Sequence, residues 1–71
     1  MELKNGNVYN IGQSINGIQN FLYLGDTWFY YRKDFTREYE YDQAELTRLV
    51  KENESAEVTL VGNIFNALSP N

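Results

Sequence analysis

Residues 15–32 read INGIQNFLYLGDTWFYYR and contain two turn signals that divide the first half of the chain into strands. Asn16-Gly17 lies between two isoleucines. In such a context Asn-Gly is the strongest short-range hairpin signal, because a type I′ turn needs positive φ at both central residues. Gly25-Asp26 fits a type II′ turn, in which glycine comes first. Together they predict a three-stranded meander over residues 8–15, 18–24 and 27–32.

The two turns also predict which residues face each other across the strands. Ile15 should pair with Ile18 around the first turn, and Leu22 with Phe29 around the second. Directly paired residues of antiparallel strands share one face of the sheet. The aliphatic face is therefore the expected core, made of Tyr9, Ile11, Ile15, Ile18, Leu22, Leu24, Phe29 and Tyr31.

The second half of the chain adds two strands and a helix. Residues 36–41 alternate aromatic or basic side chains with polar ones, which predicts a fourth strand. Asp42, with Glu45 three residues later, is a capping box, and the apolar stripe behind it predicts a helix over residues 43–52. Residues 56–61 read as a last strand. We expect one mainly β, α+β domain over residues 1–71, with a frayed tail at 69–71.

Four or five antiparallel strands with one helix allow two architectures. The first is a small SH3-like barrel in which the last strand returns to the first. The second is an open sheet with the helix on its core face. The barrel is favoured because closure would hide strand edges that so small a chain cannot otherwise protect.

Several aromatic side chains lie on the outward face of the predicted sheet. Nine of the eleven aromatic residues lie between Phe21 and Tyr41. Tyr, Trp and Arg dominate binding hot spots, since they offer large contact areas with polar tips. The expected partner-binding residues are Phe21, Tyr23, Trp28, Tyr30 and Arg32. The competing interpretation is that the helix or the C-terminal residues cover this face and make it a second core.

Charge is distributed unevenly along the chain. The net charge is −4, and the acids concentrate in the second half, where Glu38, Glu40 and Asp42 form a candidate acidic face. Such a face would repel phosphate and attract a basic partner, or it simply solvates the surface. Binding of nucleic acid is therefore not expected.

The residue types present also exclude several classes of function and location. The chain has no Cys and no His, and no recognisable base lies beside its serines, so we expect no enzyme, no cofactor and no metal site. Disulfides are excluded, and the longest apolar runs span only four residues, too few to cross a membrane. We expect a cytoplasmic protein.

These observations favour a non-enzymatic protein-binding module. Small viral or phage accessory proteins that bind and inhibit a host protein often have this composition. Two alternatives stay open: an oligomer that binds or sequesters a nucleotide-like ligand, and a structural subunit of a larger assembly. A domain of this length forms only a small core, so a homo-oligomer also remains possible.

Overall fold

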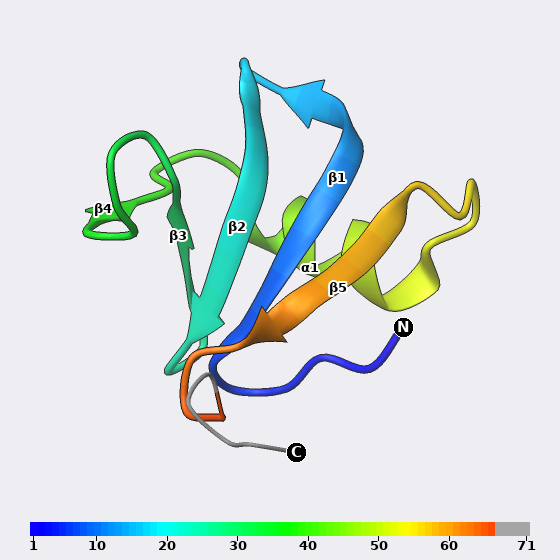
Figure 1. Ribbon diagram of the computed structural model, residues 1–71. Helices are drawn as coiled ribbons and strands as arrows, with labels where there is room; N and C mark the ends of the chain where they lie inside the picture. Colours follow the sequence, from blue (N-terminus) through cyan, green and yellow to red (C-terminus); the bar gives the residue numbers. More distant parts are fainter. Residues whose placement is uncertain (67–71) are drawn as a thin grey trace.

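A computed structural model describes residues 1–66, which form an open antiparallel sheet with one helix across one face (Figure 1). The strands lie in the order β4-β3-β2-β1-β5. The mainly β, α+β fold predicted from the sequence is confirmed. The elements are β1 (Asn7–Ile15), β2 (Ile18–Leu24), β3 (Thr27–Tyr30), β4 (Arg37–Glu38), α1 (Gln43–Glu52) and β5 (Val58–Asn63).

The element bounds agree best where local signals were strong. The helix and β2 have the predicted bounds, and β1 differs by one residue. β3 stops at Tyr30 instead of residue 32, and β4 has only two of the residues predicted over 36–41. β5 is displaced by two residues from its predicted position at 56–61. The frayed tail expected at 69–71 lies outside the described residues.

The favoured barrel is wrong, because β4 and β5 lie at opposite edges of the sheet and do not pair with each other. The sheet stays open, and the helix covers one of its faces. Leu46 and Val50 of α1 belong to the same buried cluster as Tyr9 and Trp28 of the sheet. The alternative architecture, an open sheet with the helix on its core face, is therefore the correct one.

Both tight turns lie where they were predicted, but only the first has the predicted type. Asn16 and Gly17 have φ of 53° and 77°, as a type I′ turn requires. Gly25 and Asp26 also have positive φ, 59° and 60°, so this turn resembles type I′ and the predicted type II′ is wrong. Asp26 tolerates positive φ because a short polar side chain makes this conformation less unfavourable.

The pairing of β1 with β2 determines which side chains of the two strands share the buried face. Ile15 pairs with Ile18 as predicted, but Tyr9, a predicted core residue, pairs with Phe21, which was predicted to face outward. The register shifts in between, since β1 advances from residue 10 to 15 while β2 moves only from residue 20 to 18. β1 therefore contains three more residues than β2 over this stretch. An odd excess reverses which side chains share a face.

The predicted core is therefore correct only in part. Tyr9, Ile11 and Ile18 are buried as predicted, whereas Phe21 and Trp28 of the predicted outward face are buried with them. The register between β2 and β3 is as predicted, with Leu22 opposite Phe29. Tyr9 and Ile11, however, share the helix side with Phe21 and Trp28, not with Leu22. The buried cluster comprises Tyr9, Ile11, Ile18, Phe21, Trp28, Tyr39, Leu46, Val50 and Val58.

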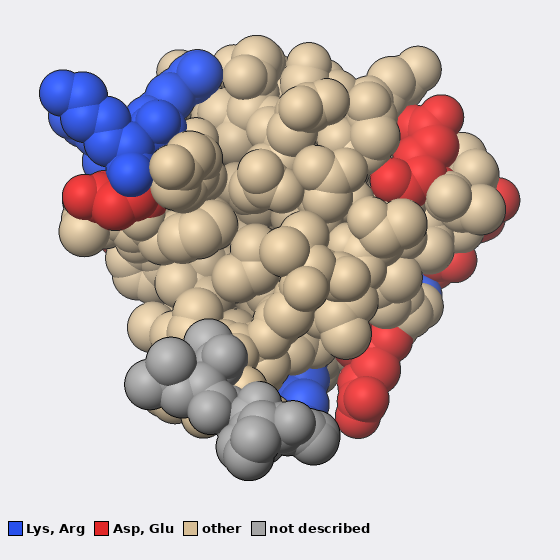
Figure 2. Space-filling view, in the orientation of Figure 1, with Lys and Arg blue, Asp and Glu red and all other residues tan. Residues whose placement is uncertain are grey.

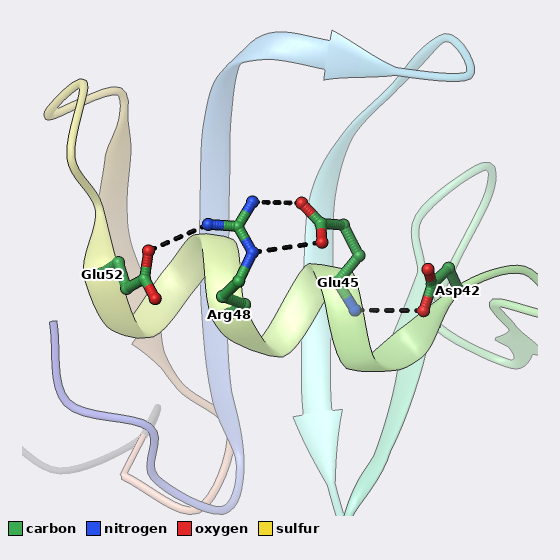
Figure 3. Close-up of polar contacts among 4 residues, drawn as sticks. All are labelled: Asp42, Glu45, Arg48 and Glu52. Atoms are coloured by element: carbon green, nitrogen blue, oxygen red, sulfur yellow. Dashed lines mark hydrogen bonds and ion pairs between the residues drawn. The ribbon is translucent and has the colours of Figure 1, made fainter.

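The helix begins and ends at well-defined caps, and its outer face carries an ion-pair chain (Figure 3). The Asp42 carboxylate accepts a hydrogen bond from the Glu45 N–H at 3.1 Å. The side chain of Glu45 pairs with Arg48 rather than completing the capping box. Arg48 also pairs with Glu52 at 2.9 Å. The Glu45 pair holds the pKa of that carboxyl below its ordinary value.

Candidate functional site

Two of the five predicted partner-binding residues lie in the core. Phe21 is fully buried and Trp28 is only 1% exposed. The Trp28 indole N–H donates to the Thr47 hydroxyl of α1 at 2.9 Å. Their predicted outward orientation is wrong because of the register shift in β1. The competing interpretation, that the helix covers this face, is correct.

The other three predicted residues lie partly or fully in solvent. Tyr23 is half-buried and its hydroxyl donates to Asp26 at 2.8 Å, a hydrogen bond that raises the pKa of the phenol. Tyr30 is also half-buried. The exposed Arg32 guanidinium lies 5.9 Å from the centre of the Tyr30 ring. Only Tyr30 and Arg32 are therefore in mutual contact at the surface.

The predicted acidic face is divided between two places. Glu38 and Glu40 line a hollow of about 260 Å³ together with Tyr30 and Arg32. The structure thus brings two of the predicted binding residues together with two of the predicted acids. Asp42 lies instead at the start of α1, where its carboxylate caps the helix.

A second hollow beside it is lined by basic side chains. Arg32, Lys33 and Arg37 surround a space of about 360 Å³, whose lining also includes Tyr30, Asp34 and Thr36. Figure 2 shows blue side chains gathered at the corner of the molecule where Figure 1 places β4. Asp34 accepts hydrogen bonds from the Thr36 hydroxyl at 2.6 Å and from its N–H at 3.1 Å, which lower the Asp34 pKa. These bonds order the turn that presents the cations.

The edge of the sheet next to this turn is closed. β4 consists of two charged residues, Arg37 and Glu38. Where β3 and β4 separate, the Gln43 side chain fills the gap between their backbones. Its Oε1 accepts from the Trp28 N–H at 3.3 Å, and its Nε2 donates to the Tyr39 carbonyl at 2.6 Å. Short, charged strands and satisfied backbone groups are the usual protection of a sheet edge.

The other edge of the sheet is protected at one residue. The Asn53 amide donates to the Val58 carbonyl at 3.1 Å and accepts from the Val58 N–H at 3.0 Å. Val58 therefore directs both backbone groups away from β1, toward the side where a further strand would lie. Successive residues of a strand alternate in this direction, so Leu60 is the next to point outward. Among the described residues, β5 has a neighbouring strand on one side only.

Exposed apolar side chains gather around this edge. Leu60, Val61 and Phe65 are 54%, 62% and 64% exposed, and Ile64 is 40% exposed. We call these four residues the β5 surface. Val61 and Ile64 also line an uncharged hollow of about 460 Å³.

The strands on the inner side of β5 are uncharged as well, whereas Figure 2 shows acidic side chains along the right-hand margin of the molecule, beyond β5. β1, β2 and β5 contain no Asp, Glu, Lys or Arg. The face of the sheet opposite α1 is accordingly free of charged side chains over its middle (Figure 2). Sequence reasoning missed this surface, although one signal was available: every residue from Val58 onward is uncharged.

Two features are absent from residues 1–66. No group of three or more Asp, Glu, His or Cys side chains in this part of the chain is arranged to hold a metal ion. No helix there combines the length and apolar character that crossing a bilayer requires.

The fold and its edges define a class: a small α+β domain whose open sheet has one closed, charged edge and one apolar, partly open edge. Comparison of the chain with protein-family models, with curated proteins and with solved structures finds no match in any of the three.

Proposed function

We propose that this chain is a non-enzymatic protein-binding module that contacts its partner through the β5 surface. The observation that supports this most strongly is the exposure of Leu60, Val61, Ile64 and Phe65 beside a sheet edge. Single exposed apolar residues are ordinary, whereas grouped ones typically mark interaction sites. An edge strand can also receive a strand from a partner, which supplies main-chain hydrogen bonds.

The chemistry of the surface restricts the partner. The hollow beside Val61 and Ile64 has no charged lining residue. A charged partner side chain placed there would lose water without gaining a counter-charge, which is unfavourable. The partner segment is therefore extended and apolar where it contacts β5.

Val61→Lys tests the proposal, because it places a charge in the β5 surface at an exposed position. Ala44→Lys adds the same charge on the exposed side of α1 and is the matched control. Both variants should keep the far-ultraviolet circular dichroism and melting temperature of the original chain. Proteins captured from lysate by the original chain and by Ala44→Lys, but lost with Val61→Lys, should then bind at least about tenfold more weakly to purified Val61→Lys. Equal capture by both variants would reject the β5 surface as the site.

A second candidate function is supported by the basic hollow. We propose that Arg32, Lys33 and Arg37, with the Tyr30 ring, can receive a small nucleotide-like anion. Arg32 is already oriented, since its guanidinium donates to the Asn16 and Gly17 carbonyls at 3.3 and 3.4 Å.

Titration with adenosine monophosphate, followed by the NMR signals of the arginine side chains and the Tyr30 ring, tests this candidate. We expect saturable shifts that Arg37→Gln weakens, while the control Arg48→Gln on the helix leaves them unchanged. Absence of shifts at about 10 mM nucleotide, well above a dissociation constant of about 1 mM, would exclude a meaningful site.

A further inference from the structure

The uncharged edge of β5 fits one particular partner, and this inference rests on the proposed function. We infer that two copies of the chain associate by pairing β5 with β5, antiparallel across a two-fold axis. The two sheets then form one continuous sheet. A two-fold interface uses the same surface on both copies and closes, so association stops at the dimer.

The geometry of the edge specifies the residue at the axis. The backbone N–H and C=O of Val58 point outward, but both are hydrogen-bonded to the side-chain amide of Asn53. Leu60 is the next outward residue, and the pairing of β5 with β1 shifts just beyond it. In an antiparallel ladder, a directly opposed pair can exchange both N–H···O=C hydrogen bonds. Leu60 of one copy can therefore pair with Leu60 of the other.

This register brings no like charges together. Pairing at Leu60 sets Val58 opposite Gly62 and Glu57 opposite Asn63 of the other copy. Within residues 1–66, and apart from its two neighbours in the chain, no atom lies within 4 Å of where a Cβ on Gly62 would lie. Like charges directly opposite each other would destabilise a strand pair, and this register contains none.

The length of the ladder explains why the side chains matter. Asn53 limits the ladder on one side and the shift beyond Leu60 limits it on the other. Few hydrogen bonds can form, so burial of Leu60 and Val61 supplies most of the attraction. Interfaces between identical chains are more apolar than others and contain few charges at their centre, which agrees with the composition of β5.

The net charge of each copy predicts how the dimer responds to salt. Each chain carries −4, and the acids lie outside β5. Two such chains repel at long range, and salt screens that repulsion with a Debye length of about 10 Å at 0.1 M. Dimerisation should therefore strengthen as salt is raised, whereas association driven by opposite charges would weaken.

Sedimentation velocity and NMR on the full chain test the inference. We expect a monomer–dimer equilibrium with a dissociation constant below about 1 mM. Leu60→Lys and Val61→Lys should each weaken it at least about tenfold, and the control Ala44→Lys should not. The Leu60 amide should become more protected from hydrogen exchange as protein concentration rises. Mixed labelled and unlabelled samples should give contacts between Leu60 of different copies.

Three outcomes would overturn self-pairing. The first is a monomer at about 1 mM, above the expected dissociation constant. The second is a dimer that survives Leu60→Lys, and the third is a Leu60 amide whose exchange does not depend on concentration. Failure here remains distinguishable from failure of the proposed function. If the chain is monomeric but Val61→Lys still abolishes capture of another protein, the surface binds a different partner.

Discussion

The two edges of the sheet are treated in opposite ways, although the same helix reaches both. At the β4 edge, the strand is two residues long and charged, and the Gln43 side chain accepts a hydrogen bond from the Trp28 backbone N–H. At the β5 edge, the strand is six residues long and uncharged, and the Asn53 side chain hydrogen-bonds the backbone of Val58 only. Gln43 is the first residue of α1 and Asn53 is its C-cap. Each end of the helix thus supplies one amide to one edge.

This difference separates two roles of the helix. It covers the core, and its terminal amides take the hydrogen-bonding positions that another strand would use. At the β4 edge, the amide of Gln43 bonds the backbone beside the point where β4 starts. At the β5 edge, the amide of Asn53 protects only the backbone groups of Val58. An apolar strand edge left open is an aggregation risk, so its presence supports a contact that the chain uses.

Trp28→Ala should have the largest effect on the closed edge. It removes a buried indole and its bond to Thr47, and losing a buried aromatic ring typically destabilises by about 3–5 kcal/mol. A core of this size supplies only about 3–5 kcal/mol in total, so the variant should be largely unfolded at 25 °C.

Circular dichroism and urea unfolding check this result, with Trp28→Phe as a milder control that keeps a ring. If Trp28→Ala unfolded cooperatively at nearly the original midpoint, the indole would lie outside the core. The pairing of Tyr9 with Phe21 would then be wrong as well.

Local signals in the sequence were sufficient for much of the fold. The positions of both hairpin turns, the register of β2 with β3 and the bounds of α1 depend on neighbouring residues, and all of these were predicted. The excess of three residues in β1 was not, because Gly12, Gln13 and Ser14 carry no apolar pattern that favours one register. Gly12 was the available signal, since glycine inside a strand often marks a bulge. An added Cβ there would lie 3.3 Å from the Glu57 carbonyl oxygen.

The candidate site was harder to predict for a related reason. Leu60 and Val61 are exposed because β5 is an edge strand. Which strand lies at the edge depends on pairing between residues that are distant in sequence. The roles of Gln43 and Asn53 also depend on the final geometry, because an amide side chain can bond to many backbone groups. Composition favoured a binding module, and the predicted register assigned the binding to five residues, of which Phe21 and Trp28 lie in the core.

Gln43→Ala should break the closed edge without touching the core. It leaves the partly buried Trp28 N–H and Tyr39 carbonyl without their side-chain partner. An unsatisfied buried polar group typically costs about 1–3 kcal/mol. Urea unfolding should show a loss in this range, and the Trp28 amide should exchange faster. Gln43→Glu keeps the acceptor, but it sets a carboxylate beside the Tyr39 carbonyl and the Glu38 carboxylate, so its loss should be at least as large. No change in either variant would mean that the amide contributes nothing to the edge.

Asn53→Gly should have a smaller effect on stability and a distinct effect on association. Glycine keeps the left-handed backbone, where Asn53 has φ of 44°, but loses both bonds to Val58. We expect a loss of about 1 kcal/mol. Asn53→Ala should lose a further 1–2 kcal/mol, roughly, from left-handed strain. Both variants lengthen the open edge, so sedimentation should show stronger self-association than in the original chain. Weaker association in Asn53→Gly would contradict the role of this amide as a partial cover.

Thr36→Val should have the smallest effect, confined to the charged turn beside β4. The Thr36 hydroxyl is the main cause of the lowered pKa of Asp34. A carboxyl whose pKa is lowered by folding stabilises the fold above its ordinary pKa, and this stabilisation is lost as pH falls through the lowered value. In Thr36→Val, the Asp34 titration followed by carbon NMR should move up toward the ordinary value. The loss of stability on acidification should shrink accordingly.

Glu45, whose pKa is lowered by Arg48, is an internal control and should titrate as before. Because the two edges are separate, self-association through β5 should also stay unchanged, and a change there would show that they are coupled.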